Sequence, residues 1–313
     1  MIIKTEQDVT TAVLSELERV EDPRIREVLG AFARHLHAFA REVELTEAEF
    51  HKAIDYVNQL GQFTTEDHNE GSLMSGTLGF SALVCLLNNG DYGQTETTAN
   101  LLGPFWRTDS PKMKNGESIV RSPTPGTPLF ATISLQDPAG KPVTGATIDV
   151  WHSSSEGYYE NQDPNQAEWN LRGQFTSDEN GQIMFRSIKP QGYPIPVNGP
   201  VGDLVRVQKR HNMRPAHLHF LACKPGFRTH ISQVYSNDDP YLETDVQFGV
   251  TERLIGAYVH HQKEASPDPD VTDSWYSLAF TLLLEPGEMI LPKPPITEKA
   301  VGDRPELEIL ERV

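Results

Sequence analysis

The segment Arg214-Pro-Ala-His-Leu-His-Phe220 holds the side chains best suited to chemistry in this sequence. Residues two apart in a β-strand point to the same face of the sheet, so a strand here would present the imidazoles of His217 and His219 side by side. Such a pair suits a metal centre. For an isolated pair of this spacing the alternative is one buried and one surface histidine, so the pair needs further ligands before it predicts a site.

Two glycine-flanked tyrosines lie upstream of this pair, in Gly157-Tyr-Tyr159 and Gly192-Tyr193. Tyrosine is ordinarily an amphipathic residue of the core, and Tyr158 stands beside Tyr159 as an alternative ligand. A deprotonated phenol is nevertheless a hard, anionic oxygen ligand. Two phenolates and two neutral imidazoles suit Fe(III) better than Fe(II) or Zn(II). Two phenolates and one hydroxide also neutralise a ferric ion, which makes the centre tolerable in a protein interior.

With these residues the sequence resembles the intradiol ring-cleaving dioxygenases, non-haem Fe(III) enzymes that use O₂ to open catechol-type rings between the two hydroxyls. The resemblance covers nearly the whole chain. The segments that carry it are Leu102-Gly-Pro-Phe105, Asp149-Val-Trp-His152 with Gly157-Tyr-Tyr159, Phe185-Arg-Ser-Ile188 with Gly192-Tyr193, Arg214-Pro-Ala-His-Leu-His219, and Gln233. Together, and in this order, they are specific to the family.

The resemblance implies a role for each matching residue. The ligands of the ferric ion would be Tyr159, Tyr193, His217 and His219. Tyr193 would be the labile ligand that takes a proton from the substrate. Arg214 would stabilise carbanion character on the ring, and Gln233 would line the same pocket. The walls around the ring would come from Leu73, Gly76, Leu102, Gly103, Pro104, Phe105, Pro194, Ile195 and Pro196.

Within the family the sequence looks most like the hydroxyquinol 1,2-dioxygenases. These enzymes cleave benzene-1,2,4-triol to 3-hydroxy-cis,cis-muconate, which tautomerises to maleylacetate. The likeness is carried by Tyr193-Pro-Ile-Pro196 and Gly199-Pro-Val-Gly-Asp-Leu204, together with Leu102-Gly-Pro-Phe105. The nearest alternatives are a catechol or chlorocatechol 1,2-dioxygenase, or a related enzyme for a bulkier ring. Outside the family, the alternatives are extradiol cleavage by Fe(II), with two histidines and one carboxylate, and a metal-free binding sandwich.

One position departs from the family pattern. Gly76, in Met74-Ser-Gly-Thr-Leu-Gly79, stands where the family has a pocket aspartate. Its loss removes a hydrogen-bond acceptor and a negative charge. We therefore expect either a pocket open to a bulkier or more acidic ring, or another residue that fills the space.

The first hundred residues are predicted to be helical. Apolar positions recur at helical spacing in stripes such as Ile25 to Val43 and Leu73 to Leu87, and Thr46 with Glu49 forms a capping-box pattern. These stripes carry more apolar positions than packing against one sandwich needs. We therefore expect a homodimer through the N-terminal helices, because two-fold pairing is the commonest way to bury such a surface.

From residue 101 onward the composition changes. Pro and Gly become frequent, and short β-rich runs alternate with turns, which is typical of an antiparallel sandwich or barrel. We expect an α+β protein with a helical dimerisation and linker domain over residues 1–100 and an antiparallel β-sandwich catalytic domain with the Fe(III) site over residues 101–313.

Composition excludes several classes of partner. The 313 residues include 27 Lys and Arg against 44 Asp and Glu, a formal net charge of −17. Proteins that bind nucleic acids or anionic membranes need clustered Lys and Arg, so the acidic surplus argues against both kinds of partner. No apolar run reaches the length of a membrane span, and the start of the chain lacks the pattern of a secretory signal. With two cysteines and no disulfide framework, we expect a cytoplasmic protein.

The expected partners are therefore small molecules and a second copy of the chain. The resemblance implies an aromatic diol or triol and O₂ as substrates, with no nicotinamide or flavin consumed. It also implies a hydrophobic tunnel at the dimer interface that can hold a phospholipid tail.

Overall fold

The computed structural model describes residues 2–66, 68–89, 97–262, 264–300 and 302–312. The chain forms two compact units, Met1–Gln59 and Leu60–Val313. The domain boundary expected at residue 100 stays a prediction.

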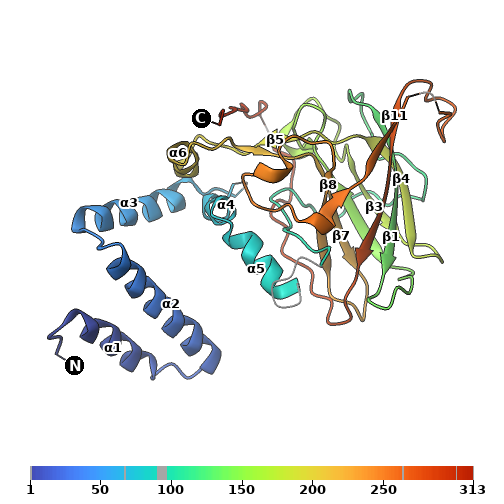
Figure 1. The fold of residues 1–313 in the computed structure, drawn as a ribbon. Helices are drawn as coiled ribbons and strands as arrows, with labels where there is room; N and C mark the ends of the chain where they lie inside the picture. The colour runs from blue at the N-terminus through green and yellow to red at the C-terminus, as the bar shows by residue number, and fades with distance from the viewer. Residues whose placement is uncertain (1, 67, 90–96, 263, 301, 313) are drawn as a thin grey trace. The chain divides into compact units, whose positions relative to one another are not determined.

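The first unit is helical. It holds α1 (Glu6–Leu17), α2 (Pro23–Glu42) and most of α3 (Glu47–Phe63) (Figure 1). The predicted capping box is confirmed at the start of α3, where the Thr46 main-chain N–H donates to Glu49 Oε2 at 2.9 Å and the Glu49 N–H donates to Thr46 Oγ1 at 3.3 Å. These bonds satisfy main-chain donors that the first turn of a helix leaves free.

The stretch Leu73–Leu87, expected as one helix, belongs to two. These are α4 (Glu70–Thr77) and α5 (Phe80–Asn89). The break lies at Gly79, whose φ of 73° is a left-handed conformation that ends a right-handed helix. No single described helix is long and apolar enough to cross a membrane, although α4 and α5 together, bent by 77°, reach that length and composition.

Two sheets form the body of the second unit. One has the strand order β10-β11-β1-β4 and the other β3-β2-β7-β8-β9, while β5 and β6 form a separate ribbon. The strands are β1 Pro128–Gln136, β2 Thr147–Trp151, β3 Arg172–Thr176, β4 Gln182–Ile188, β5 Tyr193–Pro194, β6 Met213–Arg214, β7 His217–Cys223, β8 His230–Ser236, β9 Ile255–Gly256, β10 Tyr258–His261 and β11 Trp275–Leu283. One further helix, α6 (Pro200–Val207), lies between β5 and β6 in the chain.

The expected α+β class is confirmed, but the sheets are mixed. β1 pairs in parallel with β11, with Leu129 opposite Tyr276, and β8 pairs in parallel with β9. Most other pairings are antiparallel, as between β2 and β7. A parallel pair needs a long connection between its strands, and here most of the second unit lies between β1 and β11.

The hydrophobic core lies between the two sheets. It includes Ile133 of β1 and Leu278 of β11 from one sheet, and Val150 of β2 and Phe220 of β7 from the other. Each is at most 2 % exposed. Burying one such side chain contributes roughly 1.5–3 kcal/mol to folding, so both sheets are held by their inner faces.

The described residues after β11 form no helix or named strand, yet they are fastened to the second unit. The Ala300 N–H donates to the carbonyl oxygen of Asn161. The side chain of Asn212 bonds the chain further on, by accepting from the Leu310 N–H at 2.9 Å and donating to the Glu308 carbonyl oxygen at 2.9 Å. The tail therefore follows the surface of the unit.

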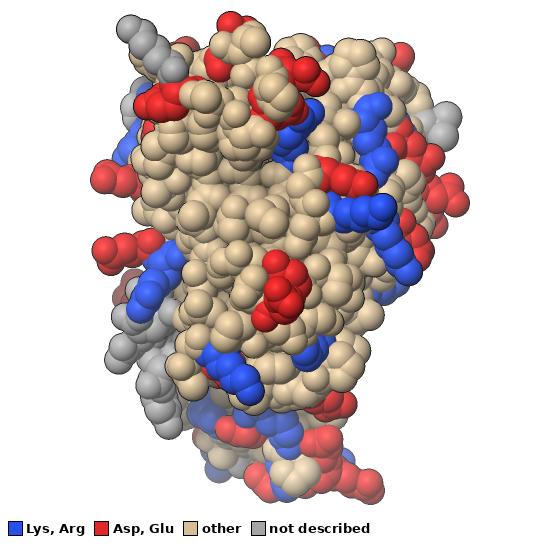
Figure 2. All heavy atoms as spheres, turned by 90° about the vertical axis from the view of Figure 1, so that its right-hand side faces the viewer, with Lys and Arg blue, Asp and Glu red and all other residues tan. Residues whose placement is uncertain are grey.

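Charged side chains are dispersed over the face of the molecule shown in Figure 2. Lys and Arg alternate there with Asp and Glu, separated by wide uncharged areas. A nucleic-acid surface gathers basic residues, and this face has no such patch.

Candidate active site

The candidate site lies on the outer face of the five-stranded sheet. Because Phe220 of β7 points into the core between the sheets, His217 and His219 point to the opposite face. Both histidines are nevertheless only 1 % exposed. A second apolar cluster, which includes Trp151 and Tyr159, covers this face. The predicted imidazole pair is therefore on one side of a strand that is buried on both sides.

A row of side chains crosses the sheet at His219. The register pairs His219 with Trp151 of β2 on one side and with Gln233 of β8 on the other. The indole stacks on the imidazole with ring centres 4.7 Å apart and planes 9° from parallel, which fixes the ring orientation. His217 is paired in the same way with Tyr235.

Two tyrosines meet the histidines from outside the sheet. The Tyr159 hydroxyl lies 2.8 Å from His219 Nε2 and 3.3 Å from the Tyr193 hydroxyl. The Nε2 atoms of His217 and His219 are 3.1 Å apart. The structure thus brings together the four side chains that the sequence predicts as ligands.

Tyr158, the alternative to Tyr159, lies elsewhere. Its hydroxyl donates to the carbonyl oxygen of Pro305 at 3.1 Å, and the Arg304 guanidinium lies over its ring. The preceding Gly157 has a φ of 84°, and a Cβ there would lie 3.1 Å from the Cβ of Tyr193. A glycine at this turn therefore lets the two tyrosine segments approach each other.

The histidine hydrogen bonds identify a free lone pair. His217 Nδ1 lies 2.6 Å from the carbonyl oxygen of Pro215. A carbonyl only accepts, so Nδ1 carries the proton and the lone pair is on Nε2, which faces the cluster. Burial, reinforced by Arg214, lowers the pKa of His217 to about 3. Burial also lowers the pKa of His219 well below its usual value, so both rings are neutral donors.

The phenol of Tyr159 behaves in the opposite way. Burial raises its pKa well above the ordinary value, and the neighbouring Tyr193 raises it further. Only a strongly charged cation would ionise this group. Two phenols and two neutral imidazoles therefore fit a ferric ion. Within the described residues no three His, Cys, Asp or Glu side chains gather as a metal site.

Arg214 belongs to a buried hydrogen-bond chain beside the histidines. Its Nε and Nη2 donate to the two carboxylate oxygens of Asp245 at 3.1 and 3.0 Å, and Nη2 also donates to the Tyr235 hydroxyl at 2.7 Å. That hydroxyl donates to Gln233 Oε1 at 2.8 Å, and Gln233 Nε2 donates to the Leu101 carbonyl oxygen at 2.7 Å. Burial alone would lower the pKa of Arg214, but Asp245 together with Tyr235 and Tyr193 outweighs burial, and the pKa stands well above the usual value.

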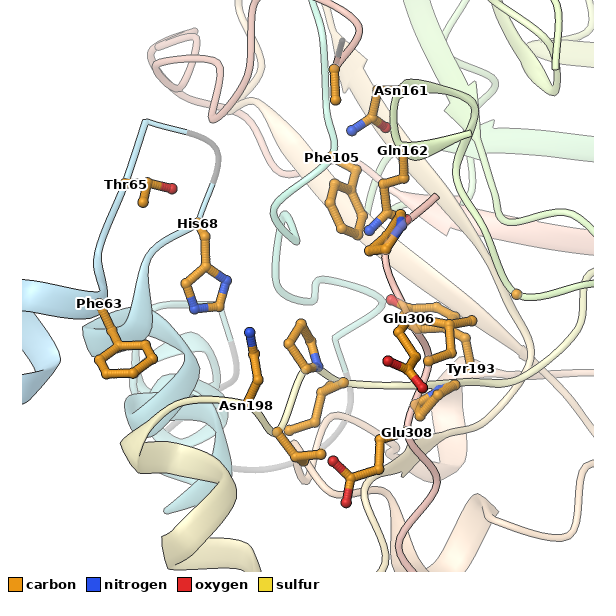
Figure 3. A pocket seen from close by; sticks show the side chains of 18 of the residues that line it. Phe63, Thr65, His68, Phe105, Asn161, Gln162, Tyr193, Asn198, Glu306 and Glu308 are labelled. Carbon is orange, nitrogen blue, oxygen red and sulfur yellow. The ribbon is translucent and has the colours of Figure 1, made fainter. Parts of the chain in front are cut away.

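A cavity of about 940 Å³ opens on Tyr193. The predicted wall residues Phe105 and Pro194, Ile195 and Pro196 line it, together with carboxylates of the C-terminal tail. Phe63 and His68 lie across the cavity from Phe105 and Tyr193 (Figure 3). Tyr193 is 7 % exposed, whereas Tyr159 is 1 % exposed, so Tyr193 is the cluster member nearer to solvent.

The predicted segment Leu102-Gly-Pro-Phe105 passes close to His219. Gly103 has a φ of 76°, and a Cβ there would lie 2.8 Å from His219 Cε1. Glycine is therefore favoured at residue 103 by the left-handed backbone conformation and by the closeness of the His219 ring, which leaves no room for a side chain. Leu102 and Phe105 pack against the apolar cluster on this face, while Pro104 is exposed.

The remaining predicted wall residues, Leu73 and Gly76, lie on α4, where Leu73 is half-buried and Gly76 buried. The space beside Gly76 is not open. A Cβ there would lie 1.6 Å from Oε1 of Gln247. Of the two expectations for this position, the one realised is another residue filling the space.

Sequence reasoning missed three kinds of supporting residue. Asp245 holds Arg214 from a loop with no local signal. Tyr235 could have been found, because it stands two residues after Gln233 on the same face of β8. Behind Tyr159, the buried Glu160 carboxylate accepts from two arginines, at 2.8 Å from Arg107 Nη1 and 2.7 Å from Arg172 Nε.

Comparison with known proteins gives two family matches. Residues 22–95 match the model described as the catechol dioxygenase N terminus, and residues 101–286 match the model described as dioxygenase. Together they cover most of the chain.

Two curated relatives and one solved structure show the same likeness. Hydroxyquinol 1,2-dioxygenase of Rhizobium sp. (strain MTP-10005) is 39 % identical over 255 residues, 81 % of this chain and 85 % of the relative. Catechol 1,2-dioxygenase of Candida albicans is 36 % identical over 267 residues, 85 % of this chain and 87 % of the relative. The structure of hydroxyquinol 1,2-dioxygenase from Pseudomonas putida DLL-E4 has a TM-score of 0.81 at 33 % identity and covers 90 % of this chain and 99 % of that one.

Asp245→Asn should destabilise the protein strongly. The carboxylate accepts from Arg214 and from the N–H groups of Gln247 and Gly249, and the amide would leave the buried guanidinium unpaired. We expect a loss of about 3–5 kcal/mol in urea unfolding. Asp203→Asn, which removes an exposed ion pair with Arg206, is the control and should change little. Equal stability of the two variants would show that the buried pair does not support the site.

Proposed function

This chain belongs to the intradiol ring-cleavage dioxygenases, and we propose that it opens hydroxyquinol (benzene-1,2,4-triol) between two adjacent hydroxyls with O₂ and ferric iron. The product would be 3-hydroxy-cis,cis-muconate, in equilibrium with maleylacetate. The observation that carries the proposal is the convergence of two tyrosine oxygens and two histidine nitrogens within 3.3 Å of their neighbours. Beside them stands a buried arginine.

Tyr159, Tyr193, His217 and His219 would hold the iron. When bound there, ferric iron would supply Lewis-acid chemistry that makes the diol reactive towards O₂. The chain contributes the donor atoms in a fixed arrangement. His217 is held by Pro215, and the His219 ring is held by its stack on Trp151.

The two tyrosines would have different roles. Tyr159 is buried, and its ring centre lies 4.6 Å from the ring centre of Phe105. Tyr159 would therefore remain in place through the reaction. Tyr193 faces the cavity, where the diol would enter. We propose that its oxygen, a phenolate when Tyr193 ligates iron, takes a proton from a substrate hydroxyl as the diol binds and becomes a neutral phenol, which is general-base work by a positioned side chain.

Arg214 would act on the substrate by charge. Asp245 and Tyr235 engage its Nε and Nη2, while Nη1 has no hydrogen bond among the described residues. A guanidinium held in this way is a preorganised donor for negative charge that develops on the ring. Gln233 is fixed at both ends of its amide and would line the same pocket.

The choice of ring rests on the relatives. Two of the compared enzymes carry the name hydroxyquinol 1,2-dioxygenase, and a fungal relative of similar identity carries the name catechol 1,2-dioxygenase. Catechol and chlorocatechols are therefore the alternative substrates. Initial rates of the iron-loaded enzyme on hydroxyquinol, catechol, chlorocatechols and pyrogallol would separate them, and the proposal requires hydroxyquinol to have the highest kcat/KM.

We also propose a homodimer through the first three helices. Along α2 the side chains of Ile25, Phe32, Leu36 and Phe39 are 49–64 % exposed, although they follow helical spacing on one face. A second copy of the chain would cover these residues by two-fold pairing. A phospholipid tail in the interface would cover further apolar surface, as the family resemblance implies.

His217→Ala and His219→Ala should each lose iron and the visible absorption band together. Tyrosinate bound to Fe(III) gives a burgundy charge-transfer colour, and each variant removes a neutral nitrogen donor. Metal analysis and a visible spectrum check this. Tyr158→Phe is the matched control, because Tyr158 bonds to Pro305, and it should keep both iron and colour. Full iron occupancy in either histidine variant would contradict its role as a ligand.

Arg214→Lys should keep iron and colour but lower kcat by about 10²–10³. The compact ammonium of lysine lacks the planar fork by which Arg214 holds both oxygens of Asp245 and Tyr235, so its charge would not be fixed in the same place beside the ring. Steady-state kinetics on the preferred diol measures the loss. Arg206→Lys, on α6 and half exposed, is the control. Turnover near the wild-type value would show that Arg214 is only structural.

Light scattering at micromolar concentration should give the mass of a dimer. Phe32→Glu, at a side chain that is 64 % exposed, should shift the protein towards monomer because a charge would enter the apolar interface. Lys52→Glu, on α3, is a control that alters charge without removing apolar surface. A wild-type monomer under these conditions would refute the proposed pairing.

A further inference from the structure

Two buried arginines share one buried carboxylate next to Tyr159. Glu160 Oε1 accepts from Arg107 Nη1 at 2.8 Å and from Arg172 Nε at 2.7 Å, and all three side chains are at most 3 % exposed. Arg107 also donates to Glu168 at 3.1 Å, but the Glu168 side chain is 56 % exposed, so water screens its charge. The buried cluster of Arg107, Glu160 and Arg172 therefore carries two positive charges and one negative charge.

Arg172 stands in the same row of the sheet as two residues of the site. The register pairs Arg172 of β3 with Trp151 of β2, and Trp151 with His219 of β7. Paired residues of neighbouring strands point to the same face, so the Arg172 side chain lies on the face that carries His219. Its Nη1 donates to the Phe105 carbonyl oxygen at 2.6 Å, and the ring centres of Phe105 and Tyr159 are 4.6 Å apart. The guanidinium is thus fixed among the residues that surround the Tyr159 phenol.

Arg172 is charged in this position. Burial lowers its pKa to about 10, with Glu160 opposing that fall and Arg107 adding to it. A group with this pKa is protonated at neutral pH. Another buried carboxylate on this face, Asp149, accepts from Trp106 Nε1 and Gln174 Nε2 at 3.0 Å each. Its hydrogen bonds therefore go to neutral donors and not to the cluster.

Two cations act on the Tyr159 phenol, and they differ in how they are paired. Burial and the neighbouring Tyr193 raise the pKa of this phenol, whereas the two guanidiniums of Arg214 and Arg172 act in the opposite direction. Arg214 has a carboxylate of its own in Asp245, which cancels much of its charge at a distance. Arg172 has no carboxylate to itself, because it shares Glu160 with a second arginine.

We propose that the surplus positive charge of the Arg107–Glu160–Arg172 cluster stabilises negative charge on the Tyr159 oxygen in the iron site, so that the two tyrosine ligands are unequal. This rests on the proposed function, because it assumes that Tyr159 binds ferric iron as a phenolate. Tyr193 instead faces a cavity lined by carboxylates of the C-terminal tail such as Glu306 (Figure 3), which favour a neutral phenol. The proton of the diol would then go to Tyr193, with Arg172 as the positioning residue.

The alternative is that the cluster only braces the sheet. Arg172 Nη2 also donates to Asn161 Oδ1 at 2.9 Å, so removal of this side chain would loosen the segment after Tyr159 whatever its charge. Bracing depends on hydrogen bonds, whereas the proposal depends on charge. The tyrosinate charge-transfer band separates the two, because a positive charge near a phenolate lowers the energy of its filled orbital and moves the band to shorter wavelength.

Four variants of the iron-loaded protein test the role of charge. Arg172→Met removes the charge and should move the band to longer wavelength by on the order of 10 nm, the contribution of one nearby charge at an effective dielectric constant of about 20. Arg172→Lys keeps the charge but loses the planar fork, and its band should stay near the wild-type position. Glu160→Gln removes the negative charge and should move the band the opposite way. Glu168→Gln, at an exposed carboxylate, is the matched control and should leave the band unchanged.

Resonance Raman spectra excited within the band add a readout for each tyrosine. In Arg172→Met the phenolate C–O stretch of Tyr159 should shift, and that of Tyr193 should not. If Arg172→Met folds poorly, Glu160→Gln carries the same test with the opposite sign. Equal shifts in Arg172→Met and Arg172→Lys, or no shift in the folded variants, overturn the inference but leave the proposed function standing. A wild-type protein that binds no iron, or that shows no visible band when loaded, overturns both.

Discussion

Strand β7 is buried on both faces, and the sandwich and the site both depend on this. On one face Leu218 and Phe220 lie in the core between the sheets. On the other, His217 and His219 meet two tyrosine hydroxyls. Because neighbouring residues of a strand alternate between faces, packing of the core determines where the imidazoles point. The geometry of the site is therefore set by the same residues that hold the two sheets together, which suits a constellation that must be rigid.

The buried cation beside the site is neutralised by an ion pair. Arg214 is a buried cation, and Asp245 on a distant loop neutralises it, so the guanidinium can stay charged beside neutral imidazoles. The neutrality of His217 follows from burial and from its bond to Pro215. Burial also raises the pKa of the Tyr159 phenol well above its usual value. The site is thus composed of neutral donors and one compensated cation, an environment in which a trivalent ion can be balanced by phenolates.

The features that the sequence could predict depend on residues close together in the chain or on a repeated spacing. The Thr46–Glu49 cap and the shared face of His217 and His219 follow from spacing of two to four residues, and the structure has both. The bend at Gly79 was missed because apolar residues continue through it. The parallel pairing of β1 with β11 and the partnership of Asp245 with Arg214 join segments far apart in the chain, and no local pattern announces such contacts. Gln247 filling the space at Gly76 is of the same kind.

We propose that four side chains from three segments of the chain form one iron site. The most direct measurement is a crystal structure of the iron-loaded protein, with anomalous diffraction recorded at the iron absorption edge. We expect a single strong peak bounded by the Tyr159 and Tyr193 hydroxyls and by Nε2 of His217 and His219. A peak elsewhere, or one from which any of the four atoms stands more than a few ångströms away, would contradict it.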